Sequence, residues 1–235
     1  MKNMTRSIKP LIALAVVASA TYAWQGRTAE ARLAGETSRA VVTSVTEQSA
    51  TAKPALRYLT APEGNAARYR IREQLVGLDL PNDAVGETKL VSGVIAADSK
   101  GNVIPAESKF TVDVSKLVSD KDRRDRFVAG RVLQTAEHPT VTLVPTSIRG
   151  LSLPLPKSGT KTFELLGDLT VRGTTRPTVW KVTAQFQPNR TTGTAATAFT
   201  FDDFGIQQPR VPVVLSVADT IKLEIDFTMV PAPAK

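Results

Sequence analysis

The amino-acid sequence predicts an all-β protein, an eight-stranded antiparallel barrel with one short helix, preceded by an N-terminal signal or anchor and a linker. Apolar and polar residues alternate strictly along several segments, which indicates strands with one buried and one solvated face. The clearest is TIKLEIDFTM, in which Ile221, Leu223 and Ile225 alternate with Lys222 and Glu224. Turn-forming residues separate these segments. Eight antiparallel strands close naturally into a barrel that is either filled or holds one small ligand.

Eight segments carry this strand signal. In chain order they are RYRIREQLVGL (68–78), TKLVSGVIAAD (88–98), SKFTVDV (108–114), TVTLVPTSI (140–148), KTFELLGDLTV (161–171), PTVWKVTAQF (177–186), TAATAFTF (194–201) and TIKLEIDFTM (220–229).

The segment SDKDRRDRFVAGRVL (119–133) departs from this alternation and predicts one helix of about ten residues. Ser119 is placed as an N-cap, and Asp120 and Arg124 are spaced i,i+4. Phe127 and Val128 then face the barrel. The helix is expected to cover an edge or an open end.

The N-terminus predicts export. Three basic residues precede the uncharged run LIALAVVASATYAW (11–24), and Ala18-Ser19-Ala20 offers a cleavage site. A cleaved signal peptide and a retained membrane anchor are both open for residues 1–24, and either places the rest outside the cytoplasm. The expected location is the periplasm or another extracytoplasmic compartment, free or anchored to the inner membrane. Residues 25–66 are interpreted as a linker, 67–230 as the barrel and 231–235 as a tail.

The composition excludes several classes of function. The chain has no cysteine, so disulfides and thiolate metal sites are excluded. The net charge of +8 indicates a mildly basic surface. Because no Lys/Arg-rich block with interleaved aromatic residues is present, no nucleic-acid partner is expected.

The sequence does not predict an enzyme, a metal site or a cofactor. His138 is the single histidine, and its position before Pro139 is typical of a turn. No second histidine can complete a zinc site, and no G-x-S-x-G elbow is present. Asp202 and Asp203 are adjacent, so on a strand they would point to opposite faces and could not act as a paired acid and base.

The apolar strand faces are the candidate ligand-binding wall. Small residues on the same or neighbouring faces (Ala184, Ala195 and Thr197) leave volume for a ligand. The alternative is a filled barrel that acts as an envelope interaction or structural module. The candidate lining residues are Phe110, Val112, Phe163, Leu165, Leu169, Trp180, Val182, Phe186, Phe199, Phe201, Leu223, Ile225 and Phe227.

Cations in predicted loops could meet a polar head group, and Arg149, Arg172 and Arg176 are the candidates. The loop around LPLPKSG (153–159) is either a lid over one barrel end or a loop packed on the surface.

Five motifs in this order resemble the YceI-like family over residues 67 to 230. They are SKFTVDVSKLVSDKDRRDRF, AEHPTVTLVPTSIRGL, GDLTVRGTTRPTVWKV, FTFDDFGI and SVADTIKLEIDF. The family's Asp, followed by Arg-Asp before a helix, matches Asp120 and Arg124-Asp125. Its proline at the start of the following strand matches Pro139. Its Gly-Asp-Leu-Thr hairpin strand matches Gly167–Thr170, and its Asp-Phe-Gly matches residues 203–205.

The resemblance implies an exported, lipocalin-like barrel that binds a long apolar lipid, which could be isoprenoid-, quinone- or fatty-acid-like. The sequence departs from the family pattern at Arg172–Thr175, where His-Gly-Val-Thr is frequent, and at His138, where an aromatic residue is frequent. The first strand also lacks a familiar His-Ser pair. These departures leave the lipid's identity open, and membrane association through the N-terminus and a homodimer stay open as well.

Overall fold

The computed structural model describes residues 54–77, 80–210 and 214–233. The predicted signal or anchor at residues 1–24, and the linker as far as residue 53, lie outside these residues. In the described part of the chain, no helix is both long and apolar enough to span a lipid bilayer.

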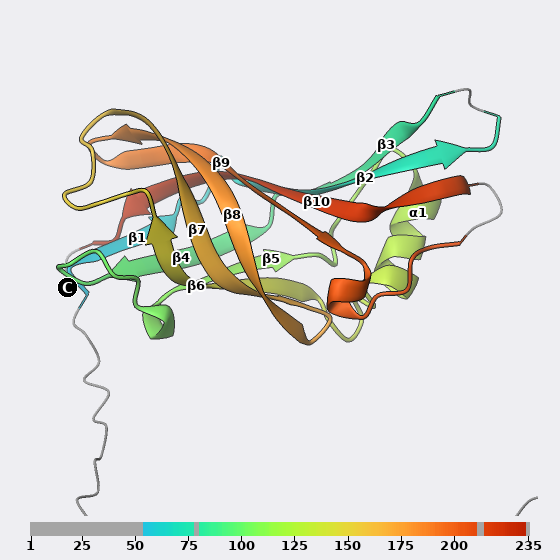
Figure 1. Cartoon of the computed structure of the whole chain (residues 1–235), viewed down its shortest axis with the longest axis horizontal. Helices are drawn as coiled ribbons and strands as arrows, with labels where there is room; N and C mark the ends of the chain where they lie inside the picture. Colours follow the sequence, from blue (N-terminus) through green and yellow to red (C-terminus); the bar gives the residue numbers. More distant parts are fainter. Residues whose placement is uncertain (1–53, 78–79, 211–213, 234–235) are drawn as a thin grey trace, which may run out of the picture. The chain divides into compact units, whose positions relative to one another are not determined.

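Ten strands form one antiparallel sheet in this part of the chain, joined by one α-helix and three short turns of other helical types (Figure 1). The strands are β1 (Leu56–Thr60), β2 (Ala66–Leu75), β3 (Asn82–Thr88), β4 (Val91–Ala97), β5 (Lys109–Asp113), β6 (Thr140–Arg149), β7 (Gly159–Val171), β8 (Thr174–Gln187), β9 (Arg190–Thr200) and β10 (Val214–Pro231). The helices are α1 (Asp122–Phe127), the π-helical turn η2 (Val128–Val132) and the 3₁₀ turns η1 (Pro105–Glu107) and η3 (Asp202–Phe204).

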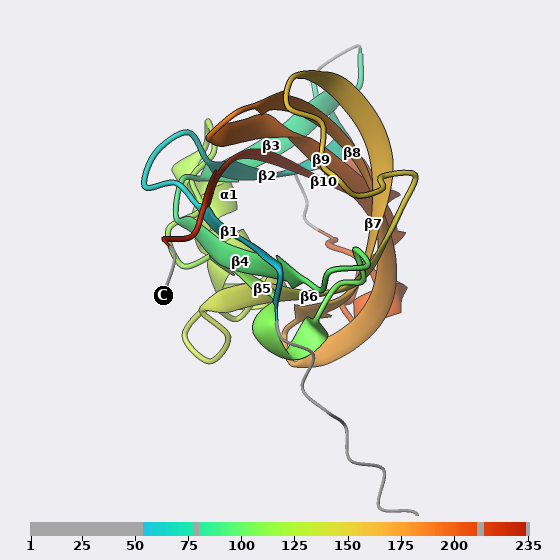
Figure 2. The same cartoon turned by 90° about the vertical axis from the view of Figure 1, so that its left-hand side faces the viewer.

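The described strands fill eight positions of a closed barrel, as predicted. One edge of β10 pairs with β9, and its other edge pairs first with β2 and then with β1. β1 and β2 therefore occupy one position in succession. β4 and β3 occupy the next position, because β4 pairs with β1 and β3 pairs with β2. Figure 2 looks into the resulting ring from the end that holds β1.

The barrel begins earlier than the sequence suggested. β1 lies within the stretch expected to be linker, and β10 runs to Pro231, one residue past the expected end. The segment LRYLT has no long alternation, and its strand state depends on pairing with β4 and β10. β3 was also missed as a separate strand. Its inward residues Ala84, Gly86 and Thr88 are small, so they give little apolar signal.

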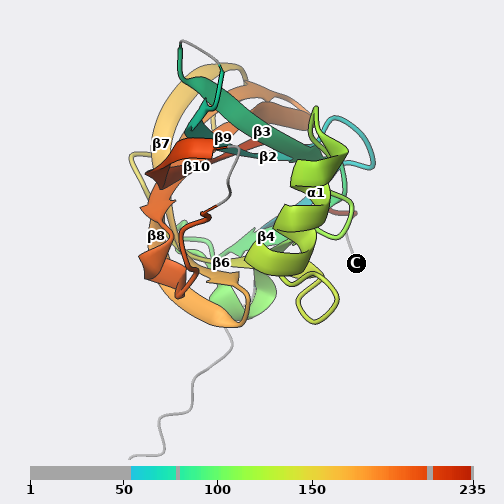
Figure 3. The same ribbon diagram turned by 90° about the vertical axis from the view of Figure 1, so that its right-hand side faces the viewer.

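The expected helix runs without a break from Asp122 to Val132, close to the predicted length, and it changes from α to π type at Val128. Lys121 occupies the N-cap position, while the Ser119 amide and hydroxyl both donate to the Asp125 carboxylate. Phe127 and Val128 face the cavity as expected. α1 lies at the opposite end from β1 (Figure 1), beside β2 and β3 (Figure 3). There the outer edge of β3 is bridged at Glu87–Val118.

Candidate functional site

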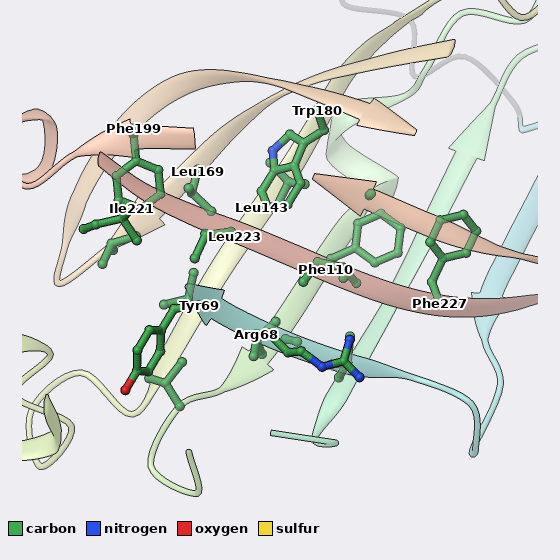
Figure 4. Close-up of a pocket in the computed structure, with 18 of the residues that line it drawn as sticks. Arg68, Tyr69, Phe110, Leu143, Leu169, Trp180, Phe199, Ile221, Leu223 and Phe227 are labelled. Atoms are coloured by element: carbon green, nitrogen blue, oxygen red, sulfur yellow. The ribbon is translucent and has the colours of Figure 1, made fainter. Parts of the chain in front are cut away.

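The inward faces of the strands enclose a cavity of about 770 Å³. Sites for small molecules usually measure roughly 300–1,000 Å³. Aliphatic and aromatic side chains from nearly every strand form its wall, and Figure 4 shows Phe110, Leu143 and Trp180 among them. The cavity follows from the strict alternation of β7, β8 and β10, which sends one apolar set inward.

All thirteen predicted lining residues lie on this wall. Ala184 and Ala195 also line it, so two of the three small residues leave volume where it was expected. Thr197 does not line the cavity, and its hydroxyl donates to the Val179 carbonyl at 2.9 Å. That these residues contact a ligand stays a prediction.

The aromatic side chains do not close the barrel. Phe163, Trp180 and Phe201 line open volume. Among the described residues, the aromatic ring pair in contact is Phe199 with Phe204, with centroids 4.6 Å apart in an edge-on arrangement. The barrel is therefore hollow in this structure, and its aromatic side chains do not fill it.

Cross-strand glycines hold three aromatic rings against the wall. At each, an added Cβ would fall closer to the opposite ring than two carbon atoms can approach, so the ring occupies the space above the glycine. These rings lean along the wall and leave the lumen clear. The pairs are Gly86–Tyr69, Gly93–Phe110 and Gly193–Phe227.

Two aromatic residues of the cavity wall, Trp180 and Tyr69, carry buried polar groups with different hydrogen bonding. Trp180 Nε1 donates to Thr178 Oγ1 at 3.0 Å, within its own strand. The buried Tyr69 hydroxyl has no hydrogen-bond partner in the described part of the chain. The tyrosine ring lies over Gly86, and Tyr69 lines both the main cavity and a small pocket beside α1. Burial raises the pKa of Tyr69 to about 12, so the hydroxyl is protonated at neutral pH.

A buried ion pair joins α1 to the barrel wall. Arg124 Nη2 lies 2.6 Å from Glu73 Oε1 on β2, and the two side chains are 15% and 9% exposed. Arg124 also pairs with Asp120, as the i,i+4 spacing predicted. Burial lowers the pKa of Arg124, but the hydrogen bonds to Asp120 and Glu73 outweigh it and leave the pKa above its ordinary value. Arg124 therefore keeps its positive charge in this position.

The loop between β6 and β7 lies at the end opposite α1 and contributes to the cavity wall (Figure 1). Leu151, Leu153 and Leu155 line the cavity, and Leu153 also packs against Gly101 in the loop after β4. These contacts place the loop on the cavity wall, and its role as a lid stays a prediction.

None of the three arginines predicted to contact a head group lines the cavity. Arg149 is exposed beside Glu164 on the outer surface. Arg172 donates to the Val132 carbonyl and to Gln134 Oε1, and so fastens the β7–β8 turn to the segment after α1. Arg176 donates to the Asp203 carbonyl. These arginines were predicted from their positions in loops, and a loop position does not show whether a guanidinium points into the lumen or away from it.

Sequence reasoning missed the charged residues that do line the cavity. Lys121, Arg123 and Arg124 come from the α1 segment, and Arg68 and Glu73 come from β2. The helix was predicted, but its position across one mouth depends on β3 and the Glu73–Arg124 pair. The Asp-Phe-Gly motif lies outside the wall. Asp203 accepts hydrogen bonds from the Thr200 amide and hydroxyl, which lower its pKa and secure the corner after β9.

The fold and the cavity define a lipocalin-like barrel with an apolar interior. The family model for the YceI-like domain matches residues 60–229, and the chain belongs to this family. A UPF0312 protein of Pseudomonas putida strain F1 is 31% identical over 114 residues, which cover 45% of this chain and 56% of that protein. A UPF0312 protein of Pseudomonas savastanoi is 27% identical over 132 residues, covering 52% of this chain and 62% of that protein. The chain thus spans somewhat more than half the length of these relatives.

Solved structures share the fold at low sequence identity. A polyisoprenoid binding domain from Saccharophagus degradans, implicated in plant cell wall breakdown, has a TM-score of 0.57 at 10% identity. The match covers 75% of this chain and 99% of that one. BcnA from Burkholderia cenocepacia has a TM-score of 0.51 at 17% identity, covering 70% and 95%.

Proposed function

We propose that this chain binds one long apolar lipid inside its barrel and does not act as an enzyme. The observation that carries the proposal is the open apolar cavity, in which the aromatic rings lie along the wall and the lumen is left clear. An isoprenoid-, quinone- or fatty-acid-like chain fits such a lumen because it is recognised by shape and apolarity. The shared fold with a domain described as polyisoprenoid binding agrees with this choice of ligand.

The energetics allow useful affinity without any cofactor. Each methylene transferred from water to an apolar wall contributes about 0.8 kcal/mol, so fifteen such groups yield roughly 12 kcal/mol. Association costs several kcal/mol, at the lower end about 4. The remainder, about 8 kcal/mol, corresponds to micromolar binding.

The wall offers no evident machinery for catalysis. The single histidine, His138, is not among the lining residues. Across the described ranges, no group of three His, Cys, Asp or Glu side chains could hold a metal ion. Glu73 is the acidic residue on the cavity wall, and it is paired with Arg124. These observations favour binding over catalysis.

The proposed place of action is the cell envelope outside the cytoplasm. The basic residues followed by an uncharged run at the N-terminus support export, with either cleavage or retention as an inner-membrane anchor. A barrel that shields a lipid from water would act there as a carrier or a reservoir.

Native mass spectrometry of the protein purified from the exported fraction, with organic extraction of whatever is bound, tests the proposal. The expected result is a discrete added mass that extracts as one lipid. A protein that is free of ligand, and stays so after incubation with isoprenoids, quinones and fatty acids, would contradict it.

A further inference from the structure

Three large apolar side chains are exposed together beside the α1 mouth. Val76, Leu80 and Leu215 are 57%, 76% and 66% exposed, and we call them the tip patch. The pairings Val214–Leu75 and Asn82–Glu73 bring the end of β2 together with the starts of β3 and β10. In Figure 1 these strand ends project to the right, past α1. Exposed apolar side chains that gather in this way mark an interaction site.

The apolar surface continues from the tip patch into the cavity. Leu75, Val76, Val214 and Val217 belong to the same strand ends, and all four line the cavity wall. A lipid chain could therefore pass from the tip to the lumen along apolar side chains. At the opposite end, Leu151, Leu153 and Leu155 of the β6–β7 loop line the cavity and are half-buried rather than exposed.

Cations lie at the same mouth. Lys121 and Arg123 are exposed and line the cavity from the α1 segment. Within residues 54–77, 80–210 and 214–233, Arg123 makes no ion pair, and Lys121 lies 4.0 Å from the exposed carboxylate of Asp120. Basic residues beside exposed apolar ones are the combination that binds the surface of an anionic membrane.

We propose that the tip patch inserts into the surface of an anionic lipid bilayer and holds the α1 mouth against the membrane. The apolar residues enter the boundary between head groups and acyl chains, and Lys121 and Arg123 face the anionic head groups. A lipid then moves between bilayer and cavity without exposing its chain to water. This transfer rests on the proposed lipid-binding function, whereas the insertion itself does not.

Site-specific fluorescence on the full chain tests the insertion. Because the chain has no cysteine, Leu80→Cys and Leu215→Cys each give one labelling site for the environment-sensitive dye NBD. Val179→Cys is the matched control, since Val179 is 49% exposed on β8 and does not line the cavity. The labelled proteins are mixed with phosphatidylethanolamine–phosphatidylglycerol vesicles that carry a nitroxide lipid quencher. This readout reports the tip itself, even if the N-terminal segment also binds the vesicles.

The expected result is a several-fold rise in emission from labels at residues 80 and 215, followed by quenching by the nitroxide lipid, with no change at residue 179. An unchanged signal at the tip would overturn the proposal. An equal change at all three sites would also overturn it. A rise with protein concentration in the absence of vesicles would show that a second copy covers the patch instead.

The transfer step has its own readout. The Leu80→Ser/Leu215→Ser variant should extract lipid from donor vesicles at least tenfold more slowly than the Leu90→Ser/Val179→Ser control, which alters exposed apolar residues elsewhere. Both variants should bind lipid added from solution equally well, because none of the four residues lines the cavity. Equal extraction rates would contradict tip-mediated transfer. If no form binds lipid from solution while the tip still inserts, the proposed function fails and the insertion stands.

Discussion

Gly86 and Tyr69 lie directly opposite each other on β3 and β2, and the tyrosine ring fills the space that any side chain at residue 86 would need. Phe110 over Gly93 and Phe227 over Gly193 repeat this arrangement. A barrel wall can thus carry several aromatic residues and still stay hollow, because each ring is accommodated by a missing side chain on the neighbouring strand.

Replacing Gly86 by alanine should therefore be destabilising. The three atoms nearest the new Cβ all belong to the Tyr69 side chain, so the ring must shift, at a cost of about 1–3 kcal/mol in the free energy of unfolding. Urea unfolding measures this. The loss should be smaller in a Tyr69→Leu background. Gly130→Ala serves as the control, since a Cβ there meets nothing within 4 Å. Equal effects at Gly86 and Gly130 would contradict the steric explanation.

The Tyr69 hydroxyl predicts a loss of stability at alkaline pH. Its pKa is about 12 in the folded protein against 10.0 ordinarily. Below pH 10 the hydroxyl is protonated in both states and has no pH-dependent effect. Between pH 10 and 12 only the unfolded state loses the proton, so stability falls by about 1.4 kcal/mol at pH 11.

Tyr69→Phe should remove this part of the alkaline loss. Unfolding free energies of the natural protein and the variant are compared at pH 8 and pH 11. All other titrating groups are the same in both proteins, so their contribution cancels in the difference between the two. Since the hydroxyl is buried without a partner, the variant should be at least as stable at pH 8. Parallel pH curves for the two proteins would mean that Tyr69 titrates normally.

At the scale of elements, α1 is too short to be stable alone, and its place across one mouth depends on side chains. The Glu73–Arg124 pair fastens it to β2, and Arg172 fastens the segment after it to the β7–β8 turn. Polar contacts therefore add to apolar packing in fixing the helical segment that borders the proposed membrane-facing mouth.

Arg124→Met should cost about 3–5 kcal/mol of unfolding free energy, because it leaves the Glu73 carboxylate buried without its cation. The Glu73→Gln/Arg124→Met double variant should recover much of the loss. Arg57→Met is the matched control. It breaks a pair with Glu107 whose side chains are 40% and 28% exposed, and such pairs contribute about 0–1 kcal/mol. Equal losses for Arg124→Met and Arg57→Met would show that burial of the pair has no special effect.

The elements that the sequence predicted well are those with long alternation. β7, β8 and β10 need one buried face, and their apolar residues show it without any partner. β1 and β3 could not be predicted this way. β1 is only five residues long, and β3 places Ala84, Gly86 and Thr88 inward because the Tyr69 ring and the cavity take the volume. A strand that leaves room for a neighbouring ring and for the cavity carries few large apolar residues, so its apolar alternation is weak.

At the scale of the whole molecule, alternation predicts the inward faces equally for a filled and a hollow barrel. All thirteen predicted lining residues lie on the wall for this reason. Whether the wall encloses space depends on which residue lies opposite which, as in the Gly–aromatic pairs, and this register is set by pairing across strands. The predicted head-group arginines illustrate the same point, because sequence position does not show which groups lie near a side chain in space. The predicted loop positions of Arg172 and Arg176 did not reveal the backbone and side-chain acceptors that hold them.

Filling the lumen should separate ligand binding from stability. Ala195 lines the cavity, and its neighbour Ala196 is exposed on the outer face of β9. In Ala195→Phe the ring enters open volume, so lipid uptake should fall at least tenfold while the free energy of unfolding changes by less than about 1 kcal/mol. Ala196→Phe should leave uptake unchanged, since it adds the same ring outside the barrel. Native mass spectrometry gives the occupancy, and urea unfolding gives the stability. A loss of about 1–3 kcal/mol in Ala195→Phe is the penalty for overpacking a filled core, and it would mean that the lumen is closed in solution.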